Sequence, residues 1–137
     1  MKREIAFRAW HNEDNYMITS ERSIYSVLQH TLNVGVGSGF SDVDTTPKPD
    51  RYELMQFIGL TDKNGRRIFE GDIVKDSDTL FVVEFGESEF LEYSGWGWIL
   101  KSNKSAFQIS PADCKVIEVI GNIYDNPELL ENVADNA

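Results

Sequence analysis

The 137-residue sequence has few of the residues from which most catalytic and metal sites are built. It contains one cysteine, Cys114, and two histidines, His11 and His30. A single cysteine excludes an internal disulfide and is typical of a protein from a reducing cytosol. The two histidines match no zinc-ligand spacing, and no His/Asn pair that would activate Cys114 is evident. We therefore expect no cofactor, no metal and no catalytic residues, in a protein that is not an enzyme.

The sequence also lacks a long uncharged apolar run, so we expect no membrane-spanning segment. Its first residues, Met1-Lys2-Arg3-Glu4-Ile5, reach an acidic residue at once and lack the apolar region of a secretory signal. These absences predict a protein that neither crosses a membrane nor carries a secretory signal.

Basic residues are scarce in the second half of the chain. The formal net charge of the whole chain is −10. Through Lys75, ten Lys and Arg face eleven Asp and Glu, a net of −1; from Asp76 onward, three face twelve, a net of −9. Such a region repels a phosphate backbone, so no nucleic-acid partner is expected. The charge indicates a solvated acidic surface that maintains solubility, with a surface for a basic partner as the alternative.

The sequence does contain many short segments rich in β-branched and aromatic residues, each bounded by Gly, Ser or Asp. An N-terminal hairpin is predicted over residues 5–18, and an apolar stripe at helical spacing predicts a helix over 20–32. The further strands expected are Tyr52–Leu60, Arg66–Phe69, Asp72–Lys75, Leu80–Phe85, Trp96–Lys101 and Lys115–Tyr124.

These segments predict a mainly β fold, a small SH3-like β-barrel with an N-terminal β-hairpin and one or two short helices. We expect a single domain. Residues 1–32 would form the hairpin and helix, residues 33–50 a variable loop, and residues 51–137 the barrel with a C-terminal helical turn.

The sequence RIFEGDIVK, residues 67–75, places two acidic residues around a glycine. Glu70 and Asp72 could form a site, but neither His nor Cys lies near them in the sequence. A tight corner explains the pattern better, because Gly71 can adopt a positive φ and Asp72 can accept hydrogen bonds from nearby N–H groups. In the same way, Asp62 and Gly65 are expected to close a hairpin.

Acidic residues are interleaved with aromatic and apolar ones in FGESEFLEY, residues 85–93, and SGWGWILK, residues 94–101, follows. Trp96 and Trp98, at i and i+2, would lie on one face of a strand. The favoured interpretation places them in the core, with acids on the other side. The alternative is a protein-binding surface. That candidate surface comprises Phe90, Tyr93, Trp96, Trp98, Glu87, Glu89 and Glu92.

Three blocks of the sequence resemble the YopX family of phage and prophage proteins: FRAW (7–10), LMQFIGLTDKNGRRIFEGDIV (54–74) and VIEVIGNIYDNPELL (116–130). The resemblance spans the chain apart from residues 33–50. It implies a phage or prophage origin, action in the bacterial cytoplasm and no known catalytic residue to transfer. Several residues of these blocks are expected to shape turns: Asp62, Gly65, Gly71, Asp72, Gly121, Asn122 and Pro127.

From these observations we expect an accessory protein that binds a protein, either a second copy of itself in a homo-oligomer or a host bacterial factor. One alternative is an enzyme whose site is assembled only in the folded chain. The other is a small-barrel nucleic-acid binder, which the acidic charge disfavours.

Overall fold

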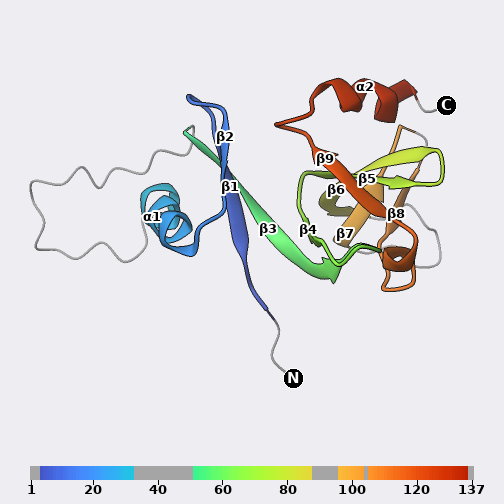
Figure 1. Ribbon diagram of the computed structural model, residues 1–137, viewed down its shortest axis with the longest axis horizontal. Helices are drawn as coiled ribbons and strands as arrows, with labels where there is room; N and C mark the ends of the chain where they lie inside the picture. Colours follow the sequence, from blue (N-terminus) through green and yellow to red (C-terminus); the bar gives the residue numbers. More distant parts are fainter. Residues whose placement is uncertain (1–3, 33–50, 88–95, 104, 136–137) are drawn as a thin grey trace, which may run out of the picture. The chain divides into compact units, whose positions relative to one another are not determined.

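The computed structural model of the protein describes residues 4–32, 51–87, 96–103 and 105–135 (Figure 1). The chain forms two compact units, one of Ala6–Met55 and one of Met1–Ile5 together with Gln56–Ala137. The division falls inside strand β3 (Tyr52–Thr61), between Met55 and Gln56.

The N-terminal unit is built on a hairpin of β1 (Phe7–His11) and β2 (Tyr16–Ile18). The two strands are antiparallel, and the beginning of β3 lies on the other side of β1. Helix α1 (Glu21–Leu32) follows, and the hydroxyl of Ser20 accepts a hydrogen bond from the Ser23 N–H at its start. Ala9, Ile18, Ile24 and Val27 form the small core of this unit.

The second unit contains the remaining elements. They are β4 (Arg67–Phe69), β5 (Asp72–Asp76), β6 (Thr79–Glu87), β7 (Trp96–Lys101), β8 (Ala106–Gln108), the 3-10 helix η1 (Asp113–Lys115), β9 (Glu118–Asn122) and α2 (Glu128–Asp135). Five of these strands form an antiparallel sheet in the order β8-β7-β6-β5-β9, and β4 pairs with β3.

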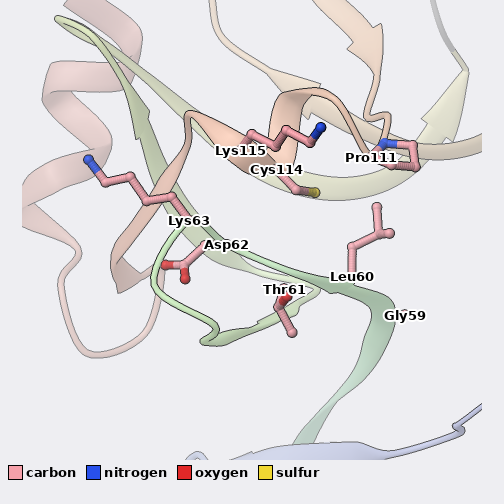
Figure 2. A pocket seen from close by; sticks show the side chains of 8 residues that line it. All are labelled: Gly59, Leu60, Thr61, Asp62, Lys63, Pro111, Cys114 and Lys115. Carbon is pink, nitrogen blue, oxygen red and sulfur yellow. The ribbon is translucent and has the colours of Figure 1, made fainter.

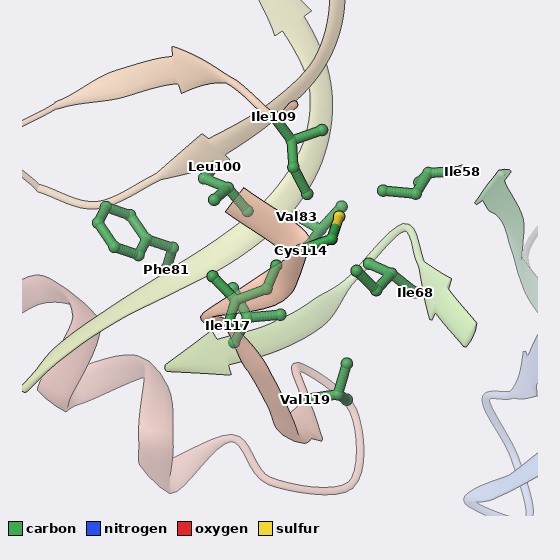
Figure 3. Close-up of a cluster of buried hydrophobic side chains, with 10 residues drawn as sticks. Ile58, Ile68, Phe81, Val83, Leu100, Ile109, Cys114, Ile117 and Val119 are labelled. Atoms are coloured by element: carbon green, nitrogen blue, oxygen red, sulfur yellow. The ribbon is translucent and has the colours of Figure 1, made fainter. Parts of the chain in front are cut away.

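The five-stranded sheet is apolar on both faces. One face carries Val74, Val83 and Leu100, which pack with residues from β3, β4, η1 and β9 into the main core (Figure 3). The other face carries Ile73, Leu80 and Val82, which pack against Leu129 at the start of α2. Because side chains alternate along a strand, runs such as Leu80–Val83 supply both faces and read as uninterrupted apolar sequence.

The predicted mainly β fold with an N-terminal hairpin and one or two short helices is confirmed, and the sheet expected as a small β-barrel is curled into a half-barrel. The expected strand over Lys115–Tyr124 was too long, because Asp113–Lys115 is a turn of 3-10 helix and β9 begins at Glu118. Asp113 stabilises that turn by accepting hydrogen bonds from the N–H and hydroxyl of Ser110, at 2.8 and 2.9 Å. Strand β8 was not predicted. The loop expected at 33–50 lies outside the described residues.

Candidate functional site

Three aromatic rings lie together on β6 and β7, near the ends of these strands. Phe85 is directly opposite Trp98 across the two strands, and their ring centroids are 5.3 Å apart in an edge-to-face arrangement. Phe85 is also stacked on Trp96, at a centroid distance of 6.5 Å. With Glu87, the cross-strand partner of Trp96, these residues form what we call the aromatic patch.

The aromatic patch continues the core-facing side of the sheet beyond the core. Val83 and Leu100 are fully buried cross-strand partners, and the next pair on the same face is Phe85 and Trp98. Trp98 is half-buried and packs against the main core, but Phe85 is 57% exposed and Trp96 is 71% exposed. The favoured expectation of a core position was therefore wrong for Trp96, because the strand extends past the residues that cover this face.

The predicted binding surface is only partly described. Trp96, Trp98 and Glu87 lie together on one face of the sheet, and Glu87 is exposed. Phe90, Tyr93, Glu89 and Glu92 lie outside the described residues. Phe85 was not among the predicted residues, although an aromatic residue in the strand preceding Trp96 and Trp98 was a usable signal for it.

A pocket of about 510 Å³ lies between β3 and η1 (Figure 2). Its lining residues are Gly59, Leu60, Thr61, Asp62, Lys63, Pro111, Cys114 and Lys115. Figure 2 shows Cys114 facing β3, whereas the Lys63 and Lys115 side chains extend in different directions. Burial raises the pKa of the Cys114 thiol, and the charges of Asp113 and Asp62 raise it further. This thiol is therefore protonated at neutral pH and is a poor nucleophile.

The carboxylate of Asp62, at the rim of this pocket, accepts hydrogen bonds from the backbone. Its Oδ1 accepts hydrogen bonds from the N–H groups of Asn64 and Arg66, and its Oδ2 accepts one from Val119, all at 2.9 Å. Burial alone would raise the pKa of Asp62, but these three donors and the charge of Arg66 outweigh burial and lower it. The ionised carboxylate thus joins the β3–β4 turn to β9. Gly65, with φ of 81°, completes the turn.

The Glu70–Asp72 corner is also held by hydrogen bonds to the backbone. Asp72 is 1% exposed, and its Oδ2 accepts a hydrogen bond from the Phe69 N–H at 2.8 Å. Gly71 has φ of 87°, donates its N–H to the Val83 carbonyl and accepts from the Ile123 N–H. Burial raises the pKa of Glu70; an N–H from Gln56 opposes this effect, and the charge of Glu84 adds to it.

The segment 121–127 forms the third backbone-shaped corner. The side-chain oxygen of Asn122 accepts hydrogen bonds from the N–H groups of Tyr124 and Asp125, at 3.0 and 2.8 Å. Asn126 accepts one from the Asn122 N–H. A Cβ at Gly121 would lie 2.8 Å from the Asn126 Cγ, so the close approach requires glycine. Pro127 follows and precedes α2.

The two histidines contribute no site within the described residues. His11 is buried between two tyrosines, stacked on Tyr16 and edge-on to Tyr52. Its Nδ1 accepts a hydrogen bond from the Asp14 N–H. His30 lies in α1, and its side chain is outside the described part of the structure. Across that described part, no three His, Cys, Asp or Glu side chains gather as a metal site would require.

The family model described as YopX protein matches residues 6–131. The chain belongs to the YopX family. The match covers most of both units of the fold. A crystal structure of protein EF1440 from Enterococcus faecalis is similar to this YopX protein, with 23% identity and a TM-score of 0.47, over 94% of this chain and 99% of that one. Comparison with the curated proteins finds no match.

The turn residues of this YopX protein and its aromatic patch have different chemical roles. The polar side chains at the three corners accept hydrogen bonds from the backbone, whereas the aromatic patch presents side chains to solvent. Over the part of the chain that is described, none of its helices is sufficiently long and apolar to cross a membrane.

Proposed function

We propose that this YopX protein is a non-enzymatic protein-binding module, and that the aromatic patch is its binding surface. The observation that carries the proposal is the exposure of two large aromatic side chains, Trp96 at 71% and Phe85 at 57%, on a structured sheet. Aromatic side chains are enriched in protein interfaces, and Trp and Tyr dominate the residues that contribute most to binding energy. Because both residues lie on paired strands, their backbone is already ordered before a partner binds, which lowers the entropic cost of binding.

The chemistry of the pocket between β3 and η1 supports a non-enzymatic role. Catalytic groups require a pKa matched to their task and a free face toward a substrate. At the pocket between β3 and η1, the Cys114 thiol is protonated and the Asp62 carboxylate is held by three backbone donors. An enzyme would need a base or nucleophile there that neither residue provides.

The biological setting forms part of the same proposal. Membership of the YopX family supports a phage or prophage origin and action in the cytoplasm of the bacterial host. The partner is a second copy of the chain or a host protein. Nucleic acid is not proposed, because the net charge of −9 from Asp76 onward opposes binding to phosphate. A salt-sensitive gel shift with duplex or single-stranded DNA would contradict this exclusion.

The test compares the unmodified protein with Trp96→Ala and with a matched control, Tyr25→Ala. Tyr25 is 63% exposed, lies on α1 and belongs to the other compact unit. If the partner is a second copy, light scattering gives a multiple of the chain mass that only Trp96→Ala reduces. If the partner is a host protein, immobilised protein retains it from bacterial lysate, and only Trp96→Ala loses it. A single-chain mass without any Trp96-dependent capture would refute the proposal.

A further inference from the structure

The two faces of the β6–β7 pair differ in charge as well as in polarity. Phe85, Glu87, Trp96 and Trp98 share one face, because cross-strand partners lie on the same side of a sheet. Glu84 and Lys101 lie on the opposite face and form an ion pair, with the Lys101 Nζ 3.8 Å from the Glu84 Oε2. The basic residue of these strands is therefore directed away from the aromatic patch. The charge that the patch itself presents is the carboxylate of Glu87.

The sequence around the aromatic patch has the same sign of charge. Between Lys75 and Lys101 there is no Lys or Arg. The acidic residues in this interval are Asp76, Asp78, Glu84, Glu87, Glu89 and Glu92. A uniformly acidic interval attracts cationic partners and repels anionic ones, including another copy of a chain whose net charge is −10.

The same protein contains an internal example of the contact that such a surface can make. The Arg67 guanidinium lies over the Phe57 ring, 5.4 Å from its centroid, and pairs with the Glu4 carboxylate. A planar guanidinium suits both partners, because it stacks on the negative face of a ring and donates hydrogen bonds in its own plane. The aromatic patch provides a similar set of acceptors, two exposed rings and a carboxylate.

We propose that the aromatic patch binds a basic, arginine-containing segment of a partner protein. One guanidinium stacks on the exposed Trp96 and Phe85 rings, and Glu87 pairs with the same or an adjacent arginine. This inference rests on the proposed protein-binding function and specifies the chemistry of the partner. A second copy is the disfavoured occupant, because docking two aromatic patches together would bring two Glu87 carboxylates close to each other. Any homo-oligomer would then use a different surface.

The test uses three acetylated and amidated heptapeptides, in which three arginines, three lysines or three glutamates alternate with glycine. Binding to the full chain is measured by calorimetric titration at low and at near-physiological salt. We expect the arginine peptide to bind about three-fold more tightly than the lysine peptide, because guanidinium stacks better on Trp. The glutamate peptide should not bind.

Two substitutions in the aromatic patch separate stacking from charge. Trp96→Ala should weaken binding of the arginine peptide by about five-fold, since the most exposed ring is lost. Glu87→Gln should weaken it by about three-fold and flatten its salt dependence. Tyr25→Ala and Glu131→Gln are the controls; both replace exposed residues elsewhere, and Glu131→Gln changes the net charge equally. Circular dichroism confirms that each variant is folded.

The outcomes distinguish this inference from the function on which it rests. Equal losses for Glu87→Gln and Glu131→Gln would show attraction by net charge alone and would overturn the inference. The inference also fails, while the proposed function stands, if the arginine peptide does not bind although a dimer or a captured host protein depends on Trp96. If Trp96→Ala changes neither peptide binding, mass nor capture, both fail.

Discussion

The β3–β4 turn and the exposed end of the β6–β7 pair both involve charged residues at the ends of paired strands, yet they use them differently. In the turn, the Asp62 carboxylate accepts three backbone N–H groups and is 5% exposed. In the β6–β7 pair, Glu87 is exposed beside two exposed aromatic rings. The first arrangement stabilises the fold, and the second is available to a partner. The comparison shows that the most recognisable sequence motif of a chain can be architectural.

The largest expected effect is on the architectural side of this comparison. Asp62→Ala should reduce the free energy of unfolding by about 3 kcal/mol, because three backbone donors, of which the Val119 N–H is buried, lose their acceptor. Urea denaturation at neutral pH measures the change, and Glu87→Ala provides the comparison at the exposed end. A loss below about 1 kcal/mol for Asp62→Ala would contradict the structural role assigned to this carboxylate.

The same carboxylate predicts the direction of a pH effect. The pKa of Asp62 is lower in the folded protein than its ordinary value of 3.8. The stabilising contribution of the ionised Asp62 is therefore complete above pH 3.8. It is lost as the pH falls through the lower pKa that Asp62 has in the folded protein. Stability of the unmodified protein should decline over this acidic range more steeply than that of Asp62→Asn. Parallel declines would contradict the prediction.

The next prediction concerns the corner at Gly71. Gly71→Val should cost about 2 kcal/mol, because a β-branched residue is strained at the observed φ of 87°. Gly97→Ala is the matched control, since its added Cβ would lie at an ordinary 3.5 Å from the nearest side-chain atom, Gln108 Nε2. Thermal and urea unfolding of both variants measure the difference. Similar stability for the two would show that the conformation of Gly71 is not limiting.

How far the sequence predicts this fold depends on whether the signal is local. Asp62 with Gly65, and Gly71 with Asp72, were predicted to make turns. A glycine at positive φ and a carboxylate that accepts a hydrogen bond from a nearby N–H are properties of a few adjacent residues. Strand β8 was not predictable in this way. Its three residues, Ala106–Gln108, form a strand through pairing with β7, which a local pattern does not contain.

The aromatic patch shows the same limit at a candidate site. Sequence alternation correctly placed Trp96 and Trp98 on one face, but it could not determine where the covering core ends. That boundary depends on residues distant in sequence, including Ile109 and Ile117 of the main core. Phe85 was missed because its position opposite Trp98 is fixed by the register of β6 and β7.

A further prediction distinguishes the two tryptophans. Trp98→Ala should reduce the free energy of unfolding by about 1.5 kcal/mol, because Trp98 packs against the main core. Trp96→Ala should cost less than about 0.5 kcal/mol, as expected for an exposed side chain. Urea denaturation followed by circular dichroism avoids reliance on the substituted fluorophores. A cost for Trp96→Ala equal to that of Trp98→Ala would mean that Trp96 serves the fold and would weaken the proposed binding role.

The smallest expected effect concerns Glu70, at the corner beside Gly71. Burial raises the pKa of Glu70 above its ordinary value of 4.5, so ionisation of this residue opposes folding. This destabilising effect of ionised Glu70 is absent below pH 4.5. It is complete above the raised pKa that Glu70 has in the folded protein. Glu70→Gln should therefore leave stability unchanged or slightly increased at neutral pH, and the difference should disappear at acidic pH. Paired urea titrations at the two pH values test this expectation. A clear loss of stability at neutral pH would show that the ionised carboxylate holds the corner together, as Asp62 holds the β3–β4 turn.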